Sequence, residues 1–105
     1  MKHPRSRWDD AFQTPIRFSL MAALVPDVEI DFRTLRELLE AEDSALSKAV
    51  SYLDAAGYVA VTKGHVGNRP RTWVCPTRRG VDAFRAHIAA LRDIAGDYPE
   101  SPVLP

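Results

Sequence analysis

The strongest constraint on this chain's fold is the order in which its hydrophobic spacing changes. Four segments carry apolar residues at every third or fourth position, the spacing of an amphipathic helix: residues 15–24, 32–39, 43–56 and 78–95. Between the last two, residues 58–62 and 71–75 are rich in strand formers, and residues 63–70 have the glycine and proline content of a turn. A short extended piece precedes the second helix, so the expected order is helix, strand, helix, helix, hairpin, helix.

Capping residues support these boundaries. Asp31 is placed as the N-cap of the second helix, and either Asp43 or Ser44 can cap the third. Gly57 suits the position just after the third helix, and Thr77 suits the cap of the fourth. The result is an α+β fold, mostly α, in the order α-β-α-α-β-β-α: a winged helix-turn-helix with a long C-terminal dimerisation helix.

Length and composition indicate one domain of a soluble, cytoplasmic protein. We expect the 105 residues to form a domain over residues 1–95 and a flexible tail over 96–105. The longest apolar run covers residues 20–25, far short of a membrane-spanning helix, and the N-terminus lacks the apolar stretch of a secretory signal. The single cysteine, Cys75, has no partner for an internal disulfide and is expected to be a small buried apolar residue.

A net charge of zero conceals a polarised chain. Residues 27–43 hold seven acids and two arginines, whereas residues 44–80 hold six Lys and Arg residues and a single Asp. The zero total argues mildly against a nucleic-acid partner, but a polyanion responds to the local patch. The basic block coincides with the third helix and the hairpin.

The polar face of the third helix presents three short hydroxyls and one cation: Ser44, Ser47, Lys48 and Ser51. A helix with these groups fits the major groove of DNA and reaches base edges and phosphates. The alternative is an ordinary solvated face. The hairpin adds a second group of candidates at its expected tip: Lys63, His65, Asn68, Arg69 and Arg71. An arginine there can enter a minor groove, although charge on an exposed hairpin also prevents edge-to-edge pairing.

The fourth helix carries a regular apolar seam. Its members are spaced by three and four residues, as in a coiled coil: Val81, Phe84, Ile88 and Leu91. This seam can pair with a second copy in a twofold dimer, and it can also pack on the first helix of its own chain. A dimer would place two recognition helices about one DNA turn apart.

The sequence gives little indication of catalysis, of metal or cofactor binding, or of an effector pocket. No catalytic constellation or phosphate loop is present, so we expect no enzyme, and the three histidines lack ligand spacing, so we expect no metal and no cofactor. Trp8, Trp73 and Phe84 could line an effector pocket, but as core residues they need no ligand.

The chain resembles the single-domain winged-helix transcriptional regulators, relatives of the MarR and ArsR families. The likeness rests on Leu-Ser-Lys at 46–48, Ala-Gly-Tyr-Val at 56–59 and Gly-x-x-Gly-x-Arg-Pro-Arg-Thr at 64–72, with further support from residues 14–17 and 30–39. It implies a homodimeric repressor that binds double-stranded DNA and occludes a promoter, with no membrane partner.

At two positions the chain differs from the residues usual in such regulators, so its preferred DNA sequence cannot be taken from theirs. Ala45 and Ala49 stand where such regulators often have Asn or Thr and His, which leaves fewer groups to recognise bases. These alanines and the zero net charge favour the alternative function, a winged-helix module for protein–protein interaction without direct DNA binding. The sequence does not indicate whether a small-molecule effector exists.

Overall fold

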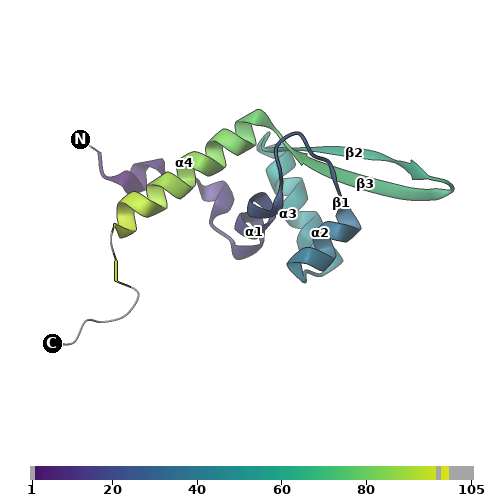
Figure 1. Ribbon diagram of the computed structural model, residues 1–105, viewed down its shortest axis with the longest axis horizontal. Coiled ribbons are helices and arrows are strands. Elements are labelled where there is room, and N and C mark those ends of the chain that lie inside the picture. Colours follow the sequence, from purple (N-terminus) through teal and green to yellow (C-terminus); the bar gives the residue numbers. More distant parts are fainter. Residues whose placement is uncertain (1, 97, 100–105) are drawn as a thin grey trace.

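The computed structural model describes residues 2–96, 98 and 99, and it has the predicted element order (Figure 1). The chain begins with two short 3-10 turns, η1 (Pro4–Arg7) and η2 (Asp10–Phe12). The α-helices and strands that follow are α1 (Pro15–Ala23), β1 (Ile30–Asp31), α2 (Phe32–Leu39), α3 (Asp43–Ala55), β2 (Val59–Val66), β3 (Arg69–Pro76) and α4 (Arg78–Ala95). The winged helix-turn-helix fold is therefore confirmed. Most of the tail predicted over 96–105 lies outside the described residues.

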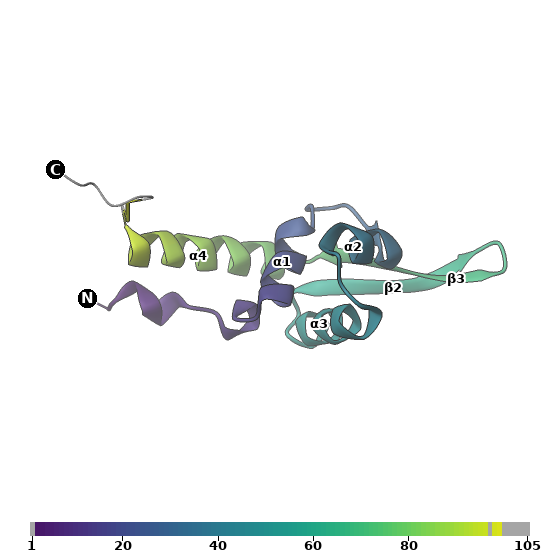
Figure 2. The ribbon, with the colours of Figure 1, turned by 90° about the horizontal axis from the view of Figure 1, so that it is seen from below.

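The three strands form one antiparallel sheet with β3 in the middle. β1 pairs with β3 only at Ile30 with Val74 and Asp31 with Trp73. The remaining length of β2 and β3 is a two-stranded hairpin, the wing, which extends away from the helices while α4 extends in the opposite direction (Figures 1 and 2).

The wing is longer than predicted, because residues 63–70 are mostly strand rather than turn. Only Gly67 and Asn68 form the turn, and the positive φ of Gly67 (62°) suits the first central position of a two-residue hairpin turn. The pair Val66–Arg69 closes this turn, so the next pair, which contains Pro70, is a non-hydrogen-bonded one. Pro70 thus sits where the ladder needs no N–H, and a proline taken as a sign of a turn is accommodated within a strand.

Side-chain caps begin three of the four α-helices. Thr14, Asp31 and Thr77 accept hydrogen bonds from backbone N–H groups in the first turns of α1, α2 and α4. The expected cap of α3 is wrong: Glu42 occupies the N-cap position without a side-chain hydrogen bond. Asp43 lies in the first turn instead, and its carboxylate accepts a hydrogen bond from Arg36 at 2.6 Å.

The core lies where α1, α2, α3 and the inner part of the sheet meet. It includes five side chains with essentially no solvent exposure, one or more from each of these elements: Leu20, Leu35, Leu46, Leu53 and Val74. The helical spacing of the leucines places them on the inner faces of their helices. The core thereby fixes α3 with its opposite face in solvent.

The start of α4 is joined to the end of α3 through backbone contacts. Thr77 donates from its backbone N–H to the Tyr58 carbonyl at 3.0 Å, and its hydroxyl donates to the Gly57 carbonyl at 2.7 Å. One turn on, Gly80 approaches so closely that a Cβ at this position would lie 2.0 Å from the Tyr58 carbonyl oxygen. The junction therefore has no room for a side chain.

The N-terminal arm runs beside the outer half of α4 (Figure 2). The backbone N–H of Asp9 donates to Nδ1 of His87 at 3.1 Å, and the Asp9 carboxylate accepts from the Tyr58 hydroxyl at 2.6 Å. This hydrogen bond to Asp9 raises the pKa of Tyr58, with burial adding to the effect. Burial lowers the pKa of His87, and the Asp9 charge opposes that shift only in part.

Trp8 and Cys75 are less buried than predicted. Trp8 is 44% exposed and packs edge-on against the His87 ring, and the Cys75 thiol is only half-buried. Trp73 is also half-buried, because it lies on the wing, where it packs against Gly64.

The predicted seam of α4 is half-buried within one chain. The fully buried line on this helix is formed by neighbouring positions instead: Gly80, His87 and Ala90. Within the seam, Phe84 packs edge-on against Phe12 and Phe18, so this residue belongs partly to the chain's own core. Among the described residues, no helix combines the length and apolar character needed to cross a membrane.

Candidate nucleic-acid interface

The exposed face of α3 carries the residues that the sequence nominated. Ser44, Ser47, Lys48 and Ser51 are all exposed, whereas Leu46, Ala49, Val50 and Leu53 are buried. Ala49 is only 3% exposed, so it is a core residue and not a missing contact to a base. Of the two alanines, only Ala45 is exposed on this face and leaves it with one group fewer to recognise bases.

A groove of about 300 Å³ separates α3 from the wing, and we call it the wing-side groove. Its walls bring Ser47 and Ser51 of α3 together with Lys63 of β2. Asp54 also lines it, one helical turn beyond Ser51. The structure thus joins two of the predicted helix residues and one predicted wing residue in a single surface.

A second groove, of about 450 Å³, lies on the other side of α3, next to the start of α1; we call it the α1-side groove. It brings Ser44 and Lys48 together with Arg17 and Tyr52. Sequence reasoning did not nominate Arg17 or Tyr52 as site residues. Tyr52 could have been found, because it follows Lys48 by four positions and so shares its helix face, but the approach of Arg17 depends on tertiary packing.

The wing distributes its polar residues along its length. His65, Asn68 and Arg69 are exposed at or next to the turn, as predicted. Lys63 and Arg71 were expected at the tip, but they lie farther back, opposite Thr72 and Gly64 respectively. The longer pairing of the two strands accounts for this difference.

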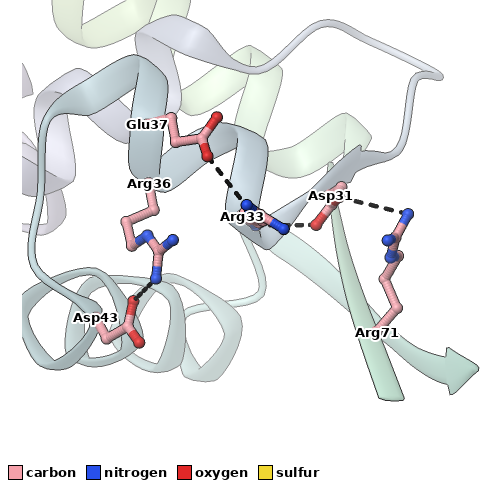
Figure 3. Close-up of polar contacts among 6 residues, drawn as sticks. All are labelled: Asp31, Arg33, Arg36, Glu37, Asp43 and Arg71. Carbon is pink, nitrogen blue, oxygen red and sulfur yellow. Dashed lines mark hydrogen bonds and ion pairs between the residues drawn. The ribbon is translucent and has the colours of Figure 1, made fainter. Parts of the chain in front are cut away.

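Arg71 also has an acidic neighbour within the chain. Its guanidinium lies 3.7 Å from the Asp31 carboxylate, whose other oxygen accepts the α2 capping hydrogen bond from Arg33 (Figure 3). One carboxylate therefore touches both the helix-turn-helix and the wing. It also neutralises part of the positive charge that Arg71 would offer to a polyanion.

Two further acidic side chains of residues 27–43 form ion pairs with arginines of α2. Asp43 pairs with Arg36 at 2.6 Å, which raises the pKa of that guanidinium, and Glu37 pairs with Arg33 at 3.3 Å (Figure 3). By contrast, three cations that border the exposed face of α3 or the wing turn make no ion pair among the described residues: Lys48, Lys63 and Arg69.

Among the described residues, the structure shows neither a cluster of metal ligands nor a shared pocket for the three aromatic residues considered as effector contacts. Across residues 2–96, 98 and 99, no group of three or more His, Cys, Asp or Glu side chains could hold a metal ion. The three aromatic residues considered for an effector pocket do not converge: Trp8 lines an open hollow beside His87, Phe84 lines another beside Met21, and Trp73 packs on the wing.

Several solved structures share this fold at low sequence identity. A transcriptional regulator homologue from Pyrococcus horikoshii OT3 superposes with a TM-score of 0.77 at 22% identity, covering 90% of this chain and 94% of that one. The PcaV transcriptional regulator from Streptomyces coelicolor, solved in complex with its natural ligand, gives 0.64 at 20% identity over 91% and 70% of the two chains.

A MarR-family transcriptional regulator from Rhodococcus sp. RHA1 gives a TM-score of 0.62 at 16% identity, covering 93% of this chain and 71% of that one. At these identities the likeness establishes the fold. A search of curated proteins finds no match. These structural neighbours are transcriptional regulators rather than enzymes.

A family profile covers most of the chain. The winged helix DNA-binding domain family matches residues 16–95, from the first turn of α1 to the end of α4. The match includes the wing, the junction, the wing-side groove and every lining residue of the α1-side groove except Thr14. Because this match covers most of the chain, it shows that the chain belongs to the winged helix DNA-binding domain family.

Proposed function

We propose that this protein is a homodimeric transcriptional regulator that binds duplex DNA with α3 and the wing and occludes a promoter. One observation carries the proposal. The exposed hydroxyls of α3 share their grooves with Lys48 and Lys63, and Arg69 lies next to the wing turn. None of these three cations makes an ion pair in the described part of the chain. A polyanion can supply the missing counter-charge.

The proposed contacts divide by chemistry. Ser44, Ser47 and Ser51 offer short donors and acceptors to base edges in the major groove. The cations Lys48, Lys63 and Arg69 approach phosphates, which fix the register without reading sequence. At the wing turn, where His65 and Asn68 face the flanking minor groove, Arg69 reaches the phosphates that border this groove, while Arg71 contributes less because Asp31 already lies beside it.

Pairing through α4 completes the proposal. This helix extends away from the DNA-binding half, and its half-buried seam residues, together with Trp8 (44% exposed) and Ile94 (41% exposed), leave apolar area uncovered in one chain. A second copy can cover Val81, Ile88 and Leu91 and the accessible edge of Phe84. The twofold axis would repeat α3 and so favour a roughly palindromic site.

Fluorescence anisotropy on a pool of random-sequence duplexes, repeated across a salt series, tests DNA binding. The wild type should bind, and its affinity should fall steeply with salt. Removing one phosphate contact with Arg69→Ala should reduce the slope of log K against log salt by about 0.9. Arg78→Ala is the matched control, since this arginine is 93% exposed on α4 and outside both grooves.

No binding even at about 50 mM salt would refute the proposal and leave the protein-interaction module as the better explanation. Equal losses in Arg69→Ala and Arg78→Ala would show that only net charge matters. Sedimentation equilibrium tests the dimer separately: Ile88→Asp should shift the protein to a monomer while its circular dichroism spectrum stays unchanged.

A further inference from the structure

The α1-side groove differs from the wing-side groove in its charge. Two cations line it, Arg17 from α1 and Lys48 from α3, and none of its lining residues is acidic. The wing-side groove holds one cation, Lys63, and one acid, Asp54. A purely positive groove next to the exposed face of α3 is a favourable environment for an anion.

Arg17 is held in place before any ligand arrives. Its Nε donates to the Ala11 carbonyl at 2.7 Å, one terminal nitrogen donates to the Asp10 carbonyl at 3.1 Å, and its guanidinium lies 3.9 Å from the centre of the Tyr52 ring. All three partners are uncharged. In contrast with Arg36 or Arg71, Arg17 makes no ion pair with any described carboxylate.

This arrangement leaves binding capacity unused. A guanidinium has five N–H donors in a fixed fork, and the two backbone hydrogen bonds occupy two of them. Its side chain is already ordered, so an anion that binds it does not have to immobilise a free arginine. A charge-assisted hydrogen bond to a phosphate oxygen is among the stronger interactions available to such a group.

Lys48 adds a second cation from the recognition helix itself. It precedes Tyr52 by four residues, which places the two side chains on one face of α3 about 6 Å apart along the axis. Because Arg17 is stacked on Tyr52, Lys48 and Arg17 border the same groove from α3 and α1. Tyr52 then acts as a positioning residue.

We propose that the α1-side groove is a phosphate-binding site in which Arg17 and Lys48 together hold one phosphodiester of the DNA backbone beside the major groove occupied by α3. The inference rests on the proposed function. It adds a fixed contact on the side of α3 opposite the wing, so that the recognition helix is held to the DNA backbone along both of its edges.

The test uses the full chain and the same salt-dependent anisotropy assay. Arg17→Gln should weaken binding about tenfold, the value of one charge-assisted hydrogen bond, and should reduce the salt slope by about 0.9. Arg17→Lys should keep the slope but lose part of the affinity, because it retains the charge without the fork. Tyr52→Ala, which removes the ring that Arg17 packs against, should bind more weakly, and Tyr52→Phe, which restores the ring, should recover most of that loss.

Lys48→Gln guards against a fold defect in the Arg17 variants, since Arg17 also holds residues 10 and 11, whereas Lys48 is exposed and makes no ion pair among the described residues. If both cations hold one phosphate, the losses in the double variant will be less than additive. Wild-type affinity and slope in Lys48→Gln and in a folded Arg17→Gln, alongside weakened Arg69→Ala, would overturn this site and leave the proposed function standing. Absence of wild-type binding would instead remove the proposed function itself.

Discussion

Replacing Gly80 by alanine tests how closely α4 approaches the end of α3. In an exposed helix, this change should stabilise the protein by about 1 kcal/mol, because alanine favours the helical conformation more than glycine does. In this structure the new methyl group would lie 2.0 Å from the carbonyl oxygen of Tyr58 and within 3.0 Å of that residue's carbonyl carbon and Cα. All three are backbone atoms, so no side-chain rotation relieves the contact.

The steric term should exceed the propensity gain. Forcing an extra methyl group into a packed site costs typically about 1–3 kcal/mol, and a contact this short with backbone atoms belongs at or above the upper end of that range. The net expectation is a loss of about 2 kcal/mol in the free energy of unfolding. For a domain of this size, that corresponds to a fall in melting temperature of about 8–16 °C.

Thermal unfolding followed by circular dichroism measures this effect. Ala86→Gly, at an exposed position of the same helix, isolates the propensity term, and it should cost about 1 kcal/mol. An increase in melting temperature for Gly80→Ala, comparable in size to the loss in Ala86→Gly, would refute the close contact, because it would show that a methyl group fits between residue 80 and the Tyr58 backbone.

Two further perturbations test the same half of the molecule. Thr77→Ala removes both the α4 cap and the hydroxyl contact to Gly57, so urea denaturation should show a loss of about 2 kcal/mol in the free energy of unfolding. Thr77→Ser keeps the hydroxyl and should retain most of the stability. Equal losses in the two variants would contradict the assigned hydrogen bonds. His87 has a lowered pKa in the folded protein, so the unfolded chain binds its proton first, and stability should fall as pH drops below about 6.5. His87→Gln should flatten that part of the pH profile measured by urea titration, and an unchanged profile would rule out His87 as its source.

Helical periodicity predicted the exposed face of α3 correctly because it depends on local geometry alone. Once Leu46, Val50 and Leu53 face the core, Ser47 and Lys48 must face solvent. The same periodicity places Ala49 on the apolar face, beside Val50, and only the comparison with related regulators drew attention to it as a contact position. The periodic pattern was the better guide.

The extent of the wing could not be predicted from composition. Gly64 and Pro70 favour a turn when they are considered one at a time, but both lie in strands. Gly64 leaves room for the Trp73 ring, which a Cβ would meet at 3.2 Å, and the strand register accommodates Pro70. Both reasons involve the partner strand, which a local pattern does not contain.

Long-range contacts account for the site residues that were missed or misplaced. Arg17 reaches Tyr52 across 35 positions of sequence, and Arg71 reaches Asp31 across 40. No regular sequence spacing predicts a contact between residues so far apart in the chain. The nomination of Trp8 as core failed for a similar reason, since its partner His87 covers only part of its ring.

The short length of β1 has a consequence for the energetics of binding. Beyond Trp73, the wing has no third strand, and an isolated two-stranded ribbon is only marginally stable in water. Hydrogen exchange should therefore quicken from Trp73 toward Asn68, as local opening becomes easier than global unfolding. In the proposed complex with DNA, contact would quench these fluctuations at the outer wing, and the lost conformational entropy would offset part of the attraction proposed for Arg69.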